Sequence, residues 1–260
     1  RMKKKVLLTA GALALLVVLA GCHKFFDWKH HGHQHGPNCR VKKITSFIDG
    51  DTVVSTFHYN HKGDPVSILR SATITASPHM FFQYDRKGRL KELLGRYHFE
   101  PNGLYDTWIT YKHDWKGRII NDTVYSFGNI VNNVPQPNPS QKSYNDYEYD
   151  AWDRMVKMKH TFVLPGLGDF TTTYDFIYDA DGNLVDGYFP PYYYGNKRNI
   201  RHTHKLWMFL DRNYSVNDEA GAVAHNAAGL PLRYEPFQPG SRSFAISVDI
   251  RHAEIEYDCW

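Results

Sequence analysis

The sequence Tyr84-Asp85-Arg86-Lys87-Gly88 separates two runs rich in apolar and aromatic residues, and it is one of six copies of the same turn. The Asp side chain can accept hydrogen bonds from the backbone N–H groups that follow it, and Gly supplies the positive φ that a type I turn with a G1 bulge requires. Each copy therefore predicts a β-hairpin. The other five copies are Tyr59–Gly63, His113–Gly117, Tyr149–Asp153, Tyr178–Gly182 and His225–Gly229. Asp153 replaces Gly in its copy, and Asp tolerates the left-handed conformation.

A second set of turn signals alternates with these six Tyr-Asp turns along the chain. It comprises Asp49-Gly50, Ser77-Pro78, Pro101-Asn102-Gly103, Asn132–Ser143, Pro165–Asp169, the stretch from Pro190, and Gln238-Pro239-Gly240. Reversal at every signal predicts an all-β fold, an antiparallel up-and-down meander of about 14 strands. We expect residues 39–260 to form a single domain that is closed, or nearly closed, into a barrel, because closure removes unpaired edge strands.

The pattern within single strands predicts one buried and one solvated face. Residues 170–178 place Phe170, Tyr174 and Phe176 on the same side of a strand, and residues 244–250 alternate in the same way. The apolar run 206–210 fits either a buried strand or a short helix, because so short a run has no decisive period.

The amino-terminal segment has the composition of a secretory signal. Lys3, Lys4 and Lys5 precede an apolar run over 6–19, which is too short for a typical membrane-spanning helix. Leu-Ala-Gly-Cys at 19–22 resembles the lipobox of bacterial lipoproteins, which predicts a signal peptide over 1–21 and lipidation of Cys22. The alternative is an ordinary cleaved signal peptide. We expect a protein anchored by lipid in the cell envelope, periplasmic or surface-exposed, in the outer membrane rather than the inner.

Removal of residues 1–21 changes the charge balance. The segment contains four basic residues and no acid, so the 31 basic residues fall to 27 and equal the 27 acidic ones. A mature chain with no net charge lacks the basic footprint of a nucleic-acid-binding domain, and we expect no nucleic-acid partner.

Residues 22–38 predict a flexible tether rich in histidine. His31, His33 and His35 alternate with other residues, and imidazoles at this spacing can gather around one Zn²⁺, Cu²⁺ or Ni²⁺ ion. No carboxylate completes the set, so the prediction is a weak metal site, and the alternative is a polar spacer without any cofactor.

Two cysteines remain after lipidation of Cys22. Cys39 lies just before the first predicted strand and Cys259 at the end of the last. First and last strands are neighbours in a closed meander, and disulfides persist outside the cytoplasm, so we predict a Cys39–Cys259 bond. The alternative is two free thiols.

An aromatic stretch provides the candidate ligand-binding residues. Rings on a stiff loop offer a large contact area for a glycan or an envelope protein at little entropic cost. The alternative is that the rings plug one end of the barrel. The residues are Tyr188, Phe189, Tyr192, Tyr193 and Tyr194.

Catalytic motifs are missing from the sequence. It contains no Gly-x-Ser-x-Gly, no His-Glu-x-x-His and no phosphate-binding Gly-rich loop. We therefore predict no catalytic residues. The alternative is an envelope polysaccharide hydrolase with a carboxylate pair in the barrel lumen, because such pairs are defined by separation in space.

The chain from Cys39 to Trp260 resembles uncharacterised Gram-negative lipoproteins that carry a domain of unknown function with a porin-like barrel fold. The likeness rests on the Tyr-Asp turns, on Tyr214–Asn217 followed by Asn226–Pro231, and on the closing Tyr257-Asp258-Cys259. The turns are also similar to the YD repeats of large shell proteins. The resemblance implies a β-barrel and transfers no catalytic residue. We expect a lipid-anchored, non-catalytic binding or structural module.

Overall fold

The six predicted Tyr-Asp turns share one geometry in the computed structural model, which describes residues 38–73, 77–187, 193–236 and 243–260. In the second copy, Oδ1 of Asp85 accepts hydrogen bonds from the backbone N–H groups of Lys87 and Arg89, both at 2.9 Å. The fifth position has positive φ in every copy, including +75° at Gly88 and +60° at Asp153. All six turns, Asp153 included, are therefore confirmed.

In four of the six copies the residue before the turn is Tyr, and its hydroxyl bonds to the backbone of a neighbouring strand. The hydroxyl of Tyr84 donates to the carbonyl of Pro65 at 2.8 Å, and that of Tyr149 donates to the carbonyl of Ile119 at 2.6 Å. Tyr59 and Tyr178 make equivalent bonds to the carbonyls of Val41 and Met155. The recurring Tyr therefore stabilises the packing of consecutive hairpins.

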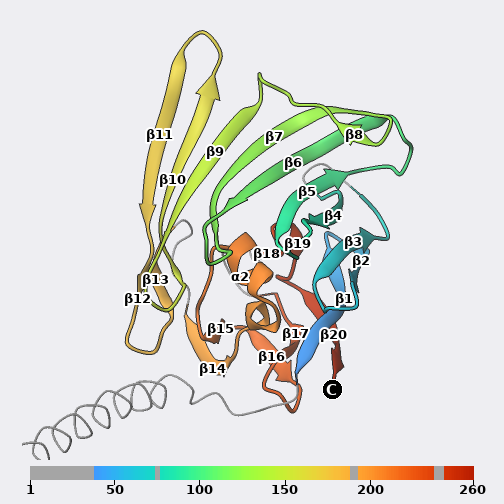
Figure 1. The fold of residues 1–260 in the computed structure, drawn as a ribbon. Helices are drawn as coiled ribbons and strands as arrows, with labels where there is room; N and C mark the ends of the chain where they lie inside the picture. Colours follow the sequence, from blue (N-terminus) through green and yellow to red (C-terminus); the bar gives the residue numbers. More distant parts are fainter. Residues whose placement is uncertain (1–37, 74–76, 188–192, 237–242) are drawn as a thin grey trace, which may run out of the picture. The chain divides into compact units, whose positions relative to one another are not determined.

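The hairpins build one large sheet of 14 strands (Figure 1). Its strands are β1 (Cys39–Ile48), β2 (Asp51–Tyr59), β3 (Pro65–Arg70), β4 (His79–Tyr84), β5 (Leu90–Arg96), β6 (Gly103–His113), β7 (Ile119–Val131), β8 (Val134–Pro135), β9 (Lys142–Tyr149), β10 (Met155–Leu164), β11 (Gly168–Asp175), β16 (Ala222–His225), β17 (Pro231–Tyr234) and β20 (Ala253–Cys259).

The order of strands confirms the antiparallel meander and contradicts its closure. From one edge to the other the sheet runs β11-β10-β9-β7-β6-β5-β4-β3-β2-β1-β20-β17-β16, with β8 paired to β7. Among the described residues no strand joins β11 to β16. The expected closure into a barrel is therefore wrong, and the sheet is open.

The reason lies in the described residues of the range 176–250, which do not supply enough long strands for closure. They form three two-stranded ribbons and two short helices besides β16 and β17. The ribbons are β12 (Ile177–Tyr178) with β13 (Leu184–Asp186), β14 (Tyr194–Arg198) with β15 (Asn217–Glu219), and β18 (Ser243–Phe244) with β19 (Val248–Asp249), and the helices are η1 (Ile200–Thr203) and α2 (Lys205–Leu210). Within the described residues, no helix is long and apolar enough to cross a bilayer.

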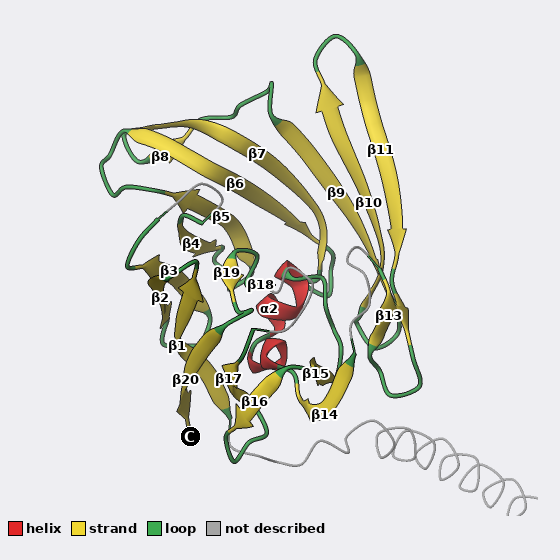
Figure 2. Cartoon of the chain, turned by 180° about the vertical axis from the view of Figure 1, so that it is seen from behind, coloured by secondary structure: helices red, strands yellow, loops and turns green. Residues whose placement is uncertain are grey.

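The apolar run 206–210, which the sequence left open between strand and helix, belongs to helix α2. The sheet curves around this helix (Figure 2). Trp207 is fully buried, with ring centroids 5.7 Å from Phe57 on β2 and 5.9 Å from Phe82 on β4. Phe209 lies 5.1 Å from Tyr147 on β9. The helix thus fills the space that inward-facing side chains of a closed barrel would otherwise occupy.

Residues 244–250 do not form the predicted continuous strand. Ala245 and Ile246 have φ of +50° and +75° and form the turn between β18 and β19. Both backbone N–H groups donate to the carboxylate of Asp211, at 3.2 and 2.9 Å. A distant carboxylate therefore holds two left-handed residues that the alternating sequence pattern does not indicate.

A smaller cluster lies apart from the main core. Leu94, Tyr105 and Ile130 pack together there. Gly128 is required at this place, because a Cβ on it would lie 2.1 Å from Oη of Tyr105. The Tyr105 hydroxyl donates to the carbonyl of Gln136, which ties the segment after β8 to this cluster.

Candidate functional site

The predicted Cys39–Cys259 disulfide is present. The two cysteines face each other in the β1–β20 pairing, with an S–S distance of 2.04 Å and a Cα–Cα distance of 4.1 Å. The bond joins the first and last strands of the sheet. Their adjacency does not require closure, because β1 and β20 are neighbours within the open sheet, and only β17 and β16 lie between β20 and the nearer edge.

Only two of the five predicted aromatic residues, Tyr193 and Tyr194, lie in the described part of the chain. Tyr188, Phe189 and Tyr192 lie outside the described residues. Tyr193 is 84% exposed, whereas the hydroxyl of Tyr194 donates to the carbonyl of Leu184 at 2.8 Å and accepts from Ser215 Oγ at 3.0 Å. Of the two described rings, Tyr193 is thus accessible and Tyr194 is part of an internal network.

The predicted lipid and metal positions also fall outside the described residues. They are Cys22, His31, His33 and His35. In the part of the chain that the structure describes, no three His, Cys, Asp or Glu side chains are grouped so that they could hold a metal ion.

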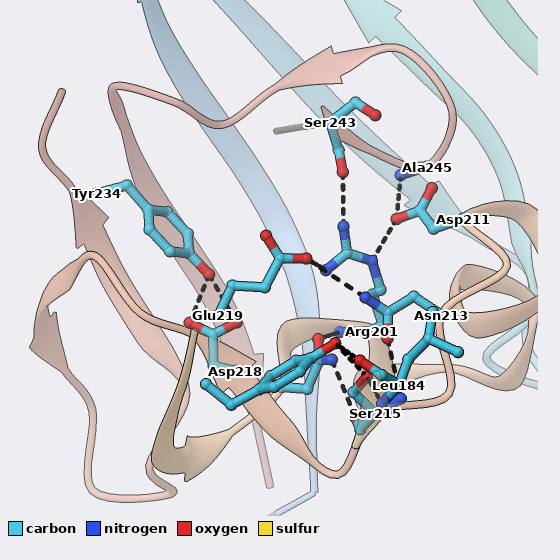
Figure 3. A network of polar contacts seen from close by, with 12 residues as sticks. Leu184, Arg201, Asp211, Asn213, Ser215, Asp218, Glu219, Tyr234, Ser243 and Ala245 are labelled. Carbon is cyan, nitrogen blue, oxygen red and sulfur yellow. Dashed lines mark hydrogen bonds and ion pairs between the residues drawn. The ribbon is translucent and has the colours of Figure 1, made fainter. Parts of the chain in front are cut away.

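The internal network is centred on buried Arg201 of η1 (Figure 3). Its Nε donates to Asp211 at 2.7 Å, one terminal nitrogen contacts Glu219 at 3.4 Å, and the other donates to the carbonyl of Ser243 at 2.8 Å. Burial alone would lower the pKa of Arg201, but the two carboxylates raise it overall. The arginine is therefore charged, and it joins η1 to the ends of α2, β15 and β18.

The interior carboxylates are engaged by protein donors. Asp218 accepts from the hydroxyl of Tyr234 at 2.7 Å, and Asp122 accepts from Asn145 at 2.7 Å and from Tyr147 at 2.5 Å. Burial raises the pKa of Asp122. These acids hold segments together, which is a role that the sequence could not distinguish from a catalytic one.

A second buried cation, Arg70 at the end of β3, has a different environment. Its side chain donates to the carbonyl of Pro78 and to the hydroxyls of Ser55 and Ser247, at 2.7, 3.3 and 2.8 Å. No acid of the described residues lies within ion-pair distance, and burial lowers the pKa of Arg70 to about 10. Arg70 thus remains protonated at neutral pH and ties β3 to the turn before β19.

The open edge at β11 is the feature with the clearest capacity to bind. β11 pairs with β10 along all of Gly168–Asp175 without a register shift, and among the described residues no strand pairs with its other side. Most of its side chains are exposed, and Phe170 is 63% exposed. A row of unpaired backbone N–H and C=O groups is a template for an added strand.

The two edges of the sheet differ in their protection. Proteins usually protect an edge with a short strand, a bulge, Pro or Lys. β16 has four residues and two register shifts, which are two such devices. β11 has eight residues, no bulge, no Pro and no Lys, and it carries Asp169 and Asp175 near its ends. Only the β11 edge is therefore suited to accept a long added strand.

The comparisons with known proteins provide no homologue from which to transfer a function. The chain matches no protein-family model, and no curated protein is similar to it in sequence. The resemblance to lipoproteins with a porin-like barrel stays a prediction.

Proposed function

We propose that this protein is a non-catalytic module of the cell envelope, anchored by lipid on Cys22 in the outer membrane, which binds an extended segment of another polypeptide along β11. The observation that carries the binding proposal is the long, unprotected β11 edge beside a protected β16 edge. Binding by strand addition derives affinity from backbone hydrogen bonds and specificity from alternate side chains.

The charge of β11 defines the chemistry of the segment that it binds. Asp169 and Asp175 lie on one face of the strand, and within the sheet Lys157 of β10 faces Asp175. A basic residue opposite each Asp would be favourable on the open side as well. The other face presents Phe170, Thr172 and Tyr174, which suit apolar or β-branched residues of the added strand.

A pair of proline variants tests the edge. Consecutive residues of a strand direct their N–H groups to opposite sides, so of Thr171 and Thr172 one donates towards β10 and the other points to the open edge. Proline at the outward position leaves the β10–β11 ladder intact and blocks an added strand, and proline at the other position lowers the melting temperature. Thr171→Val and Thr172→Val serve as controls that keep a β-branched side chain.

The probe is a labelled synthetic peptide with the sequence of β10, Met155–Leu164, titrated into the full chain and followed by fluorescence anisotropy. We expect saturable binding that the outward proline variant loses and the valine variants keep. Absence of binding, or binding that neither proline variant alters, would refute strand addition. Sedimentation velocity tests whether a second copy of this chain binds at β11 instead. A dimer that dissociates in the outward proline variant would mean that a second copy, and not another polypeptide, pairs with β11.

Lipidation is tested separately. Mass spectrometry of the peptide that begins at Cys22, isolated from the membranes of a bacterial host, should show a diacylglycerol and an acyl group, and Cys22→Ser should remove both. An unmodified cysteine would refute the anchor and leave the β11 proposal intact.

A further inference from the structure

The tips of the Tyr-Asp turns gather exposed tryptophans and cations at one end of the sheet. Trp115 is 89% exposed and Trp152 is 58% exposed, and they occupy the central positions of two neighbouring turns. Exposed cations occupy central positions of the first three turns, the third of which contains Trp115. We call these six residues the turn rim: Lys62, Arg86, Lys87, Trp115, Lys116 and Trp152.

Contacts between turns show that the rim is continuous. A Cβ at Gly88 would lie 3.8 Å from Nζ of Lys62, which places the first two turns side by side. A Cβ at Gly117 would lie 3.9 Å from the Arg89 side chain, which joins the second turn to the third. Arg118 of the third turn contacts Asp153 of the fourth at 2.8 Å.

The rim is positively charged. The acids that begin these turns are neutralised by an arginine four residues on, with Asp85 paired to Arg89 at 2.7 Å and Asp114 paired to Arg118 at 2.8 Å. The central positions of the first four turns contribute Lys62, Arg86, Lys87 and Lys116 and no acid. Over residues 59–64, 84–89, 113–118 and 149–154 together, seven Lys and Arg stand against five Asp, so this end of the sheet carries a net charge of +2.

The chain enters the domain at the same end as the rim. The backbone of Asn38 exchanges two hydrogen bonds with Trp260, at 3.1 and 2.9 Å, beside the start of β1. The first four Tyr-Asp turns lie on this side of the antiparallel sheet, because they follow the ends of β2, β4, β6 and β9. The same side holds the start of β1. Fifteen residues separate Cys22 from Asn38, and a chain of that length spans at most about 55 Å. A lipid on Cys22 would thus hold the rim within reach of the bilayer.

We propose that the turn rim lies against the surface of a bilayer that contains anionic phospholipid. Trp is the side chain that favours the boundary between headgroups and hydrocarbon, and lysine and arginine near that boundary attract anionic headgroups. This inference rests on the proposed anchor only for bringing the domain to a membrane. It adds an orientation, in which the turn end faces the lipid and the loop between β10 and β11 faces away.

Hydroxyl-radical footprinting of the full chain tests this orientation residue by residue. The protein is incubated with vesicles of phosphatidylcholine alone, or with about one third phosphatidylglycerol, and oxidation of each side chain is read by mass spectrometry. We expect the oxidation rates of Trp115 and Trp152 to fall at least about threefold on the anionic vesicles. The rates of Leu167 and Phe170, at the opposite end and 84% and 63% exposed, should not change.

Charge variants provide the matched control. Lys62→Gln/Lys87→Gln/Lys116→Gln should abolish the protection of Trp115 and Trp152, because each cation near an anionic surface contributes about a fivefold gain in affinity. Removal of three other lysines, Lys43→Gln/Lys142→Gln/Lys159→Gln, should preserve it.

Three outcomes would overturn the orientation: no protection of the two tryptophans, equal protection on vesicles without phosphatidylglycerol, or protection of Leu167 in their place. The mass of the Cys22 peptide in the same sample reports whether the chain is acylated. A failure of the anchor is thereby distinguished from a failure of the rim.

Discussion

Removal of the disulfide tests the link between the first and last strands. In the double variant Cys39→Ser/Cys259→Ser, the unfolded chain is released from a closed loop with a sequence separation of 220 residues. The chain-entropy model assigns about 5 kcal/mol at 25 °C to a loop of this length, an upper figure because the unfolded state keeps some compactness. We expect the free energy of unfolding to fall by about 3–5 kcal/mol. The melting temperature should fall by about 6–20 °C in a domain of this size.

The assay is unfolding of the full chain in guanidinium chloride, followed by both tryptophan fluorescence and far-UV circular dichroism. The oxidised chain, the reduced chain and the double serine variant are compared, and the last two should agree. Cys22→Ser is the control, since that residue lies outside the loop and should leave the free energy of unfolding unchanged. The slope of the free energy with denaturant should rise without the bond, because the unfolded chain exposes more surface.

A loss below about 1 kcal/mol would refute this reasoning. It would mean that the unfolded chain keeps β1 and β20 together without the bond, so that the disulfide restricts few additional conformations. Unfolding of β1 and β20 ahead of the rest in the serine variant would instead show that the two strands depend on the bond locally.

Three further changes test the turns and the packing. Tyr149→Phe removes a hydrogen bond to a neighbouring hairpin and should lower the free energy of unfolding by about 1 kcal/mol in a denaturant titration. The control is Tyr125→Phe, because the Tyr125 hydroxyl has no hydrogen bond within the described residues. The backbone and side chain of Arg89 lower the pKa of Asp85 to about 2, so the ionised carboxylate stabilises the fold at pH values above the ordinary carboxyl pKa. The native protein should therefore melt at a higher temperature than Asp85→Asn at neutral pH. This difference in melting temperature should disappear as the pH falls from about 4 to about 2. Gly128→Ala should cost about 1–3 kcal/mol because it displaces the tyrosine ring packed on it, whereas Gly103→Ala, which meets nothing within 4 Å, should change stability little in the same titration.

The hairpins could be predicted from the sequence because their determinants are local. Each turn is fixed by contacts within five residues, from Asp or Asn to the backbone and from a left-handed residue at the fifth position. Reversal at each turn then defines neighbours, and the pairing of Cys39 with Cys259 follows from the ends of such a meander.

Closure of the sheet and the internal network depend on contacts that no local pattern indicates. The turn at Ala245 and Ile246 is held by Asp211, more than thirty residues earlier in the chain. Tyr194 has the composition of a ligand-binding aromatic, yet its hydroxyl bonds to Leu184 and Ser215. The β11 edge could not be predicted, because it exists only where closure fails.

The two proposed surfaces are separable by mutation, which makes their combination testable. The rim lies at the turn end of the sheet, whereas β11 runs between that end and the opposite one, with Gly168 near the far loop and Asp175 nearer the turns. If the rim faces lipid, an added strand lies along the membrane normal and can be approached from the aqueous side. The lysine variants of the rim should therefore leave peptide binding at β11 unchanged, and the outward proline on β11 should leave the footprint of Trp115 and Trp152 unchanged. Loss of peptide binding in the rim variants would mean that the added strand reaches the turns, so that one surface serves both partners.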